Sequence, residues 1–131
     1  MSNITVSWRP TVIWAALPLF IGAVNEFGVA QAIPAIGREF SVQVGDLRWM
    51  SLAFLAADAA VLIAGARLGS VLGRRRVFMA GLLLFAISCI GSAMSFNYPM
   101  LLTTRALTGV GAALLFSGIL AIITQAVPRE L

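Results

Sequence analysis

Long apolar stretches alternate with short polar segments along the whole chain. Four such stretches stand out, at residues 11–33, 49–66, 77–96 and 100–127. With a helical rise of about 1.5 Å per residue, each is long enough to cross the roughly 30 Å hydrocarbon core of a bilayer. None shows the short alternating segments of an outer-membrane barrel. The pattern predicts an all-α fold, a polytopic membrane helix bundle with four transmembrane helices.

Turn formers and aromatic residues mark the expected ends of these helices. Pro10 suits the first turn of the first helix, where a missing N–H leaves no hydrogen bond unmade. Pro34 and Gly37 predict the end of that helix, and Trp49 stands where an aromatic anchor at the membrane surface would precede the second. Asn97–Pro99 is expected to form the tight turn between the third and fourth helices.

The composition narrows the class of protein further. Hydrophobic residues make up 60% of the chain and charged residues only 11%, whereas a soluble domain has about 25% charged residues. The lipid bilayer is therefore its main solvent and partner. With no histidine and a single cysteine, we expect no metal site, no cofactor and no enzymatic active site. Cys89 is expected to pack as a small hydrophobic residue.

The basic residues are all arginines, and they divide unevenly between the two sides of the predicted bundle. One side would hold Arg9, Arg67, Arg74, Arg75, Arg76 and Arg129. The other side would hold only Arg38 and Arg48, beside Glu39 and Asp46. The positive-inside rule then predicts a multi-pass protein of the inner (plasma) membrane with both termini and an arginine-rich loop, residues 67–76, in the cytoplasm. Arginines placed between apolar stretches fit membrane topology better than nucleic-acid binding.

Three charged residues fall inside the predicted spans: Glu26, Asp58 and Arg105. A charge at the centre of a membrane helix costs about 2.5–3.5 kcal/mol on insertion scales, so such residues usually face a cavity or a partner. One interpretation is a pathway for protons or substrate, because a buried carboxylate can load and release a proton near neutral pH. The other is structural, with Arg105 paired to a carboxylate of another helix. Asp58 could equally be paired or face a water-filled crevice.

Small residues recur at helical spacing in two places. Gly65, Gly69 and Gly73 follow one another every four residues, which puts them on one face of a helix where another helix can approach closely. Gly73 could instead serve the turn into the arginine-rich loop. Gly109 and Gly111 belong to a second small-residue patch, one turn beyond Arg105, for which we expect tight helix packing.

Three segments together resemble the major facilitator superfamily. Residues 67–76, Arg-Leu-Gly-Ser-Val-Leu-Gly-Arg-Arg-Arg, are similar to the loop between its second and third helices. Residues 101–113 resemble its fourth-helix motif, an arginine followed by Gly-x-Gly-Ala-Ala. Residues 25–27, Asn-Glu-Phe, followed by Ile-Pro-Ala-Ile at 33–36, are similar to the first helix of its drug-efflux branches. The order and spacing agree across most of the chain.

The resemblance implies roles for individual residues. The loop motif, which helps to control the inward-to-outward switch, would include Gly69, Gly73, Arg74 and Arg75. Arg105 matches the fourth-helix arginine associated with proton coupling in antiporters, and Glu26 an acidic position linked to substrate or proton handling. The implied function is proton-coupled efflux of small molecules or drugs, with protons and the exported molecule as partners.

The chain departs from the family pattern at several positions. Ser70 stands where the loop motif normally carries an aspartate, and Val71 where it often carries a basic residue. Ala66 replaces the first glycine of the loop motif, and Thr108 stands where glutamine is frequent in the fourth helix. The missing aspartate removes a partner from the loop arginines, so we expect a weaker gating network in the outward-facing state.

The chain is short for this family, whose members have twelve or fourteen helices. Residues 1–131 would be a partial N-terminal domain, covering about four of the six helices of one half, and the rest of the transporter would be a partner. Two alternatives remain. A four-helix dimeric transporter of the small multidrug-resistance kind fits the length and Glu26, but not Arg105 or the Gly-Arg-Arg-Arg segment. The other alternative is a membrane fragment that transports nothing.

Overall fold

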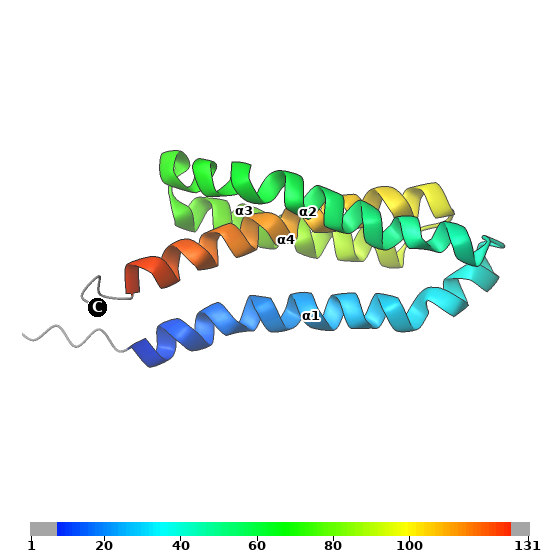
Figure 1. Ribbon diagram of the computed structural model, residues 1–131, viewed down its shortest axis with the longest axis horizontal. Helices are drawn as coiled ribbons and strands as arrows, with labels where there is room; N and C mark the ends of the chain where they lie inside the picture. Colours follow the sequence, from blue (N-terminus) through cyan, green and yellow to red (C-terminus); the bar gives the residue numbers. More distant parts are fainter. Residues whose placement is uncertain (1–7, 127–131) are drawn as a thin grey trace, which may run out of the picture.

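The computed structural model describes residues 8–126, which form four helices that run alternately up and down (Figure 1). The helices are α1 (Trp8–Glu39), α2 (Val44–Leu72), α3 (Arg74–Ala93) and α4 (Tyr98–Ala126). Each contains a segment long and apolar enough to cross a membrane. Over residues 8–126 no strand is present. The prediction of an all-α bundle with four transmembrane helices is therefore confirmed.

The first helix continues past the point where the sequence predicted its end. Neither Pro34 nor Gly37 stops it, and α1 runs on to Glu39. Proline removes one backbone hydrogen bond, which membrane helices tolerate when neighbouring groups satisfy the freed carbonyls. Beyond Pro34, Arg38 Nε donates to the Pro34 carbonyl at 3.3 Å, a further bond within the last turns of α1. The chain reverses at Ser41 instead, which has a φ of 53°, and α2 begins before Trp49.

The expected arginine-rich loop is almost entirely helical. The second helix was predicted to end at residue 66 and the third to begin at 77, but α2 extends to Leu72 and α3 begins at Arg74. Only Gly73 lies between them, with a φ of 94° that side chains rarely allow. Its carbonyl accepts hydrogen bonds from the backbone N–H groups of Arg76 and Val77, at 3.1 and 3.2 Å. A single glycine thus performs the reversal for which a ten-residue loop was expected.

The turn between α3 and α4 also lies earlier than predicted. The third helix ends at Ala93 rather than at residue 96, because the chain turns at Ser95–Asn97. Asn97 Oδ1 then accepts a hydrogen bond from Met100 N at 2.9 Å, which caps the start of α4. The Tyr98 hydroxyl donates to the backbone oxygen of Asp46 at 2.6 Å, joining the first turns of α4 and α2. The predicted end of the fourth helix, residue 127, lies outside the described residues.

The fourth helix forms the centre of the bundle, between α2 and α3 (Figure 1). One buried cluster joins these three helices through Phe54, Phe85, Ala112 and Leu115. A second cluster, Leu47, Met50 and Leu101, lies at the end where α1 meets α2. Partly buried residues of α1, among them Ile33 and Ile36, pack against it. Elsewhere α1 runs beside α4 at the edge of the bundle.

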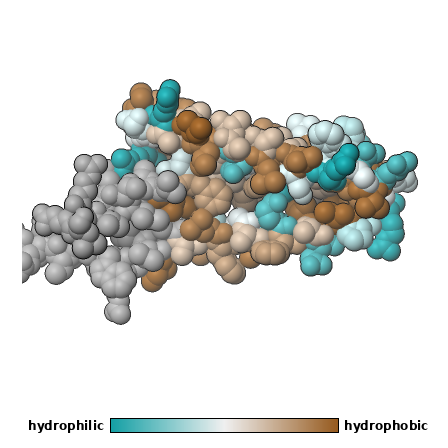
Figure 2. Space-filling model, in the orientation of Figure 1, coloured by the Kyte–Doolittle hydropathy of each residue, from teal (hydrophilic) through white to brown (hydrophobic). Residues whose placement is uncertain are grey.

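The outside of the bundle is apolar along its middle. Large hydrophobic side chains such as Phe27, Ile63 and Leu83 are exposed, as expected for helices that face lipid. Figure 2 shows hydrophobic residues over most of the visible middle and hydrophilic residues gathered at the right-hand end. The α2–α3 junction with its arginines lies at the same end of the bundle as the start of α1, and Arg38 and Arg48 lie at the opposite end (Figure 1). The bundle thus separates the basic residues as the sequence predicted; Arg129 lies outside the described residues.

Candidate functional site: an intramembrane charge cluster

Arg105 is the centre of a polar cluster between α4 and α1. Although it lies in a membrane-spanning helix, its side chain is only 2% exposed. One guanidinium nitrogen, Nη1, donates to Asn25 Oδ1 at 2.9 Å, and the other, Nη2, pairs with the carboxylate of Glu26. Two adjacent residues of α1 therefore hold one arginine of α4. Of the three predicted intramembrane charges, the fold brings Glu26 and Arg105 together.

The remaining surroundings of Arg105 come from α2. The ring of Phe54 lies 4.8 Å from the Arg105 guanidinium carbon, a distance at which the aromatic face attracts a cation. Arg105 Nε is buried and has no hydrogen-bond partner among the described residues. The arginine is thus well placed but not fully satisfied. Because Nε is still available as a donor, the guanidinium can donate to a further polar group without first breaking its two bonds to α1.

The cluster extends to α3 through Asn25. Asn25 Nδ2 donates to Cys89 Sγ at 3.5 Å, so the half-buried cysteine makes a polar contact that the sequence did not suggest. The sequence analysis placed Asn25 only within a family motif and gave it no role of its own. The available signal was an asparagine next to a glutamate in an apolar span, since an amide at membrane depth requires hydrogen-bond partners.

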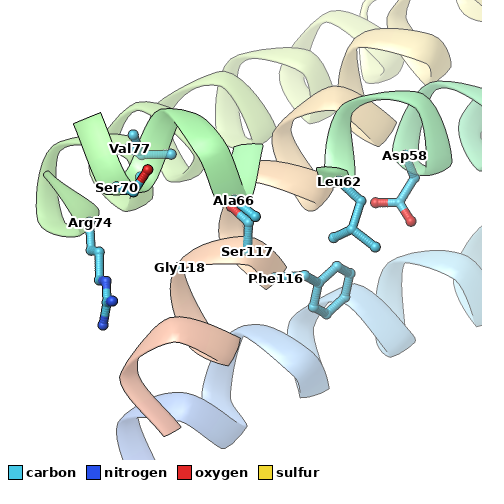
Figure 3. Close-up of a pocket in the computed structure, with 10 residues that line it drawn as sticks. Asp58, Leu62, Ala66, Ser70, Arg74, Val77, Phe116, Ser117 and Gly118 are labelled. Carbon is cyan, nitrogen blue, oxygen red and sulfur yellow. The ribbon is translucent and has the colours of Figure 1, made fainter. Parts of the chain in front are cut away.

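Asp58 lies apart from the Glu26–Arg105 pair, on the middle of α2. Within residues 8–126 it makes no ion pair, and its Oδ1 atom is buried without a hydrogen-bond partner. It lines a cavity of about 490 Å³ that lies along α2 and α4 and reaches the start of α3 (Figure 3). Figure 3 shows Asp58 beside Leu62 and Phe116 at one end of this cavity and Arg74 at the other.

Part of the predicted loop motif also lines the cavity. Gly69, Ser70 and Arg74 line it together with Asp58, although Asp58 is more than ten positions away in the sequence. Ser70 Oγ donates to the Arg67 carbonyl at 2.7 Å, a bond within its own helix. The other two members of the motif do not line the cavity: Gly73 forms the turn, and Arg75 is exposed.

Of the glycines expected to allow close helix packing, Gly65, Gly109 and Gly111 lie at close contacts with neighbouring helices. Gly69 and Gly73 do not, because an added Cβ atom would meet only Arg74 Cγ at 3.9 Å at Gly69 and nothing within 4 Å at Gly73. A Cβ atom on Gly109 would lie 2.4 Å from the backbone oxygen of Phe54 in α2. One on Gly111 would lie 2.7 Å from the backbone nitrogen of Phe85 in α3. On α2, a Cβ atom at Gly65 would meet Ser117 Oγ at 2.9 Å. Gly109 and Gly111 thus bring α4 against the backbones of both neighbours, and Gly65 brings α2 against side chains of α4.

Comparison with curated proteins finds drug-resistance and drug-efflux proteins similar to this chain. The multidrug resistance protein Stp of Mycobacterium tuberculosis is 30% identical over 119 residues, which cover 91% of this chain and 22% of the relative. The drug efflux pump JefA of the same species is 31% identical over 121 residues, 92% of this chain and 24% of the relative. The lincomycin resistance protein of Streptomyces lincolnensis is 33% identical over 107 residues, 82% of this chain and 22% of the relative.

The chain thus spans less than a quarter of the length of these curated relatives. No solved structure matches it. The sequence profile of the Major Facilitator Superfamily matches residues 15–131, which is most of the chain and includes all of the polar positions described above. With four membrane-spanning helices and this match, the chain is a multi-pass membrane protein and belongs to the major facilitator superfamily of transporters.

Proposed function

We propose that this chain forms the first four helices of the N-terminal half of a proton-coupled transporter that exports small molecules, including drugs. The names of its relatives support the substrate class: a multidrug resistance protein, a drug efflux pump and a lincomycin resistance protein. We place the transporter in the plasma membrane with the arginine-bearing end of the bundle in the cytoplasm, in accordance with the positive-inside rule.

The observation that carries the proposal is the ion pair of Glu26 with Arg105. While Glu26 is ionised, it compensates the charge of Arg105 within a membrane span. A proton on Glu26 would remove that compensation and leave the buried arginine with only neutral partners, which is costly in a low-dielectric environment. Proton binding would therefore favour any arrangement in which Arg105 is better solvated or α1 lies further from α4.

Glu26 is also placed to exchange one partner for another. Its side chain is 35% exposed, whereas that of Arg105 is buried, so a proton or a cationic group can reach the carboxylate from outside the cluster. A cation at Glu26 and a proton at Glu26 would compete for the same oxygens. Such competition is what an antiporter needs, because the entry of a proton then promotes the departure of the exported molecule.

Asp58 supplies a second candidate position for a proton. Its buried oxygen without a partner would be costly in the ionised form and much less so in the protonated form. It lies on the same cavity as Ser70 and Arg74, so its protonation would change the charge in a space bordered by the switch motif. We propose that Asp58 acts after Glu26, by linking proton uptake to the α2–α3 end of the bundle.

The switch itself is proposed to be weaker than in relatives that carry an aspartate in the loop motif. Ser70 occupies that position, and its hydroxyl is used within α2. It therefore brings no negative charge to Arg74 or Arg75. Gly69, Gly73 and these two arginines would still shape the junction of α2 and α3, but without the carboxylate that the loop motif normally supplies at position 70.

A transport assay tests the proposal. The complete reading frame that encodes this chain is expressed in cells that lack their own drug exporters, and efflux of ethidium is followed with and without a protonophore. We expect export that the protonophore abolishes. Export that persists without a proton gradient would contradict proton coupling, and no export of any tested drug would contradict the proposed function.

Two variants assign the roles of the charge cluster in the same assay. Arg105→Ala is expected to abolish the coupling of export to protons. Glu26→Gln is expected to alter both the pH profile of export and the range of cationic substrates.

The alternative functions are tested with the 131-residue chain in liposomes under an imposed pH gradient. Proton-linked dye movement there would favour a dimeric four-helix transporter, whereas its absence together with transport by the complete reading frame supports the assignment proposed here.

A further inference from the structure

The amide group of Asn25 can be oriented in only one way beside Arg105. A guanidinium has hydrogen-bond donors and no acceptor, so the asparagine must present its oxygen to it. The Asn25 Oδ1 atom lies 2.9 Å from Arg105 Nη1, in agreement with this requirement. The NH₂ group of the same amide then necessarily points away from the arginine. Inside a membrane span it needs an acceptor there, since lipid offers none.

That acceptor is the thiol of Cys89. Its sulfur lies 3.5 Å from Asn25 Nδ2, and the side chain is half-buried on α3. The helices α1 and α3 do not otherwise pack against one another within the described residues. Three helices are thus joined in a chain of contacts: Cys89 of α3 holds the amide of Asn25 on α1, and Asn25 in turn holds Arg105 on α4.

We propose that Cys89 is a positioning residue for the Arg105 cluster: it keeps the oxygen of Asn25 turned toward the guanidinium. This inference rests on the proposed function, in which Arg105 couples transport to protons. Without an acceptor at position 89, the amide gains freedom to rotate and its oxygen no longer faces Arg105 at all times. Arg105 would then depend on Glu26 alone and would keep only a neutral carboxyl group on α1 when Glu26 takes up a proton.

This role differs from that of a residue that merely fills space. Loss of the acceptor should affect the proton-dependent step, in which Glu26 is neutral and the Asn25 contact matters more for holding Arg105 on α1. It should affect the initial binding of a cationic substrate less, because Cys89 contacts Asn25 and not Glu26, where that substrate is proposed to bind. A serine at position 89 retains an acceptor, whereas an alanine retains most of the apolar volume without one.

The contact itself can be tested on the 131-residue chain without any transport assay. The chain has three asparagines, Asn3, Asn25 and Asn97, so selective ¹⁵N-asparagine labelling in lipid nanodiscs gives three side-chain amide pairs. Asn25→Asp identifies the pair of Asn25. We expect this pair to exchange with solvent at least roughly tenfold more slowly in Cys89→Ser than in Cys89→Ala, with the native chain resembling the serine variant. Equal exchange in the native chain and Cys89→Ala would overturn the contact.

The functional role is tested in the complete reading frame by measuring the rate of ethidium export against substrate concentration and external pH. Cys89→Ala should lower kcat by roughly two- to tenfold, the range expected for one hydrogen bond, with KM within about twofold. Its pH profile should shift, and Cys89→Ser should restore both. Ser92→Ala is the matched control, because it removes an α3–α4 hydrogen bond, Ser92 Oγ to Thr104 Oγ1, without touching Asn25.

The outcomes separate the two proposals. If the native protein shows no proton-linked export, the proposed function fails whatever the amide signals show. If export is proton-linked but Cys89→Ala keeps the native kcat and pH profile, the positioning role is wrong while the proposed function stands. A loss in Cys89→Ala that Cys89→Ser does not restore, or that Ser92→Ala reproduces, would also overturn it, because a general packing defect would then explain the data.

Discussion

The three helices α2, α3 and α4 and the first helix, α1, are held in the bundle by different means. On α4, Gly109 and Gly111 let the backbones of α2 and α3 approach so closely that an added Cβ atom would lie within 3 Å of them. On α1, a Cβ atom at Gly28 would meet nothing within 4 Å, and one at Gly22 only the ring of Phe116 at 3.5 Å. In its middle, α1 is instead tied to α4 through its polar side chains.

The difference follows from the physics of membranes. Lipid tails are as apolar as leucine, so helices associate in a bilayer through close packing and polar contacts rather than through hydrophobic burial. The three-helix core uses the first of these and the middle of α1 the second. Close packing is insensitive to charge, whereas the contact between Glu26 and Arg105 depends on whether the glutamate carries a proton. Under the proposed function, the helix held by charges is therefore the one that a proton on Glu26 would release.

The largest expected effect is the disruption of the packed core. A Cβ atom on Gly109 would lie 2.4 Å from the backbone oxygen of Phe54, so Gly109→Val must force α2 and α4 apart. We expect a loss of about 3 kcal/mol in the free energy of unfolding, at the upper end for overpacking. The measurement is SDS titration of the reconstituted chain, followed by far-ultraviolet circular dichroism.

The matched control for this prediction is Gly28→Val on α1, where an added side chain meets open space. It should change the free energy of unfolding by less than about 1 kcal/mol. Equal losses at Gly109 and Gly28 would show that the two regions do not differ in packing as described.

The second largest effect is expected from removal of the polar contact that holds α1. Arg105→Ala should lower the stability by about 1–2 kcal/mol, the range for polar contacts between membrane helices. The loss should be confined to α1, because the glycine contacts of α2, α3 and α4 remain. Spin-label distances between α1 and α4 should broaden while those between α2 and α4 stay narrow.

Arg38→Ala provides the comparison for Arg105→Ala. Arg38 is exposed and donates to the Pro34 carbonyl of its own helix, so its loss should leave the distance between α1 and α4 unchanged. Broadening of the α2–α4 distances in Arg105→Ala would contradict the view that Arg105 holds α1 against α4 and does not stabilise the packing of α2 against α4.

A smaller effect is expected at the junction of α2 and α3. Gly73 has a φ of 94°, so Gly73→Ala should cost about 1 kcal/mol or slightly more. Gly69 lies within a helix, and the nearest atom to a Cβ atom added there would be Arg74 Cγ at 3.9 Å. Gly69→Ala should therefore leave the free energy of unfolding unchanged. The same SDS titration compares the two variants. If Gly69→Ala is as harmful as Gly73→Ala, the reversal does not depend on the conformation of Gly73.

The smallest effect on stability is expected at Asp58. Its buried oxygen has no partner among the described residues, so replacing the carboxylate by an amide loses no ion pair. Asp58→Asn should leave the free energy of unfolding unchanged within about 1 kcal/mol or raise it slightly. A loss of more than about 2 kcal/mol would reveal a partner for Asp58 and would place it with the paired charges of α1 and α4. Asp46→Asn, at an exposed position, serves as the control.

The number and order of the helices could be predicted because each apolar stretch is long and uninterrupted enough to have one interpretation. Their ends could not. Gly73 shows why: the polar residues around it predicted a loop, but arginines are good helix formers and can extend from a helix end into the headgroup region. Pro34 shows the opposite error, since a strong helix breaker in soluble proteins is tolerated within a membrane helix.

Within the candidate site, the charged residues were predictable from the cost of placing them in lipid, and their pairing was one of two interpretations. Which carboxylate joins Arg105 depends on how α1 is rotated against α4, which no spacing along a single helix determines. Asn25 and Cys89 were missed as a pair for the same reason: they are 64 positions apart and meet only because the folded bundle brings their side chains together. The shared cavity of Asp58 and Arg74 likewise depends on the fold of α2 onto α3.

The two prolines inside α1 add a mechanical consequence to this picture. Pro18 and Pro34 stand eight residues before and eight residues after Glu26, the residue that anchors α1 to Arg105. This anchor therefore lies midway between two helical turns that each lack a backbone hydrogen bond. Each arm between the anchor and a proline is about 12 Å long at 1.5 Å per residue. The helix can therefore bend at one proline without disturbing the other. A bend at Pro18 would move the first arm alone, because the far end of α1 packs against Leu47 and Met50 through Ile36.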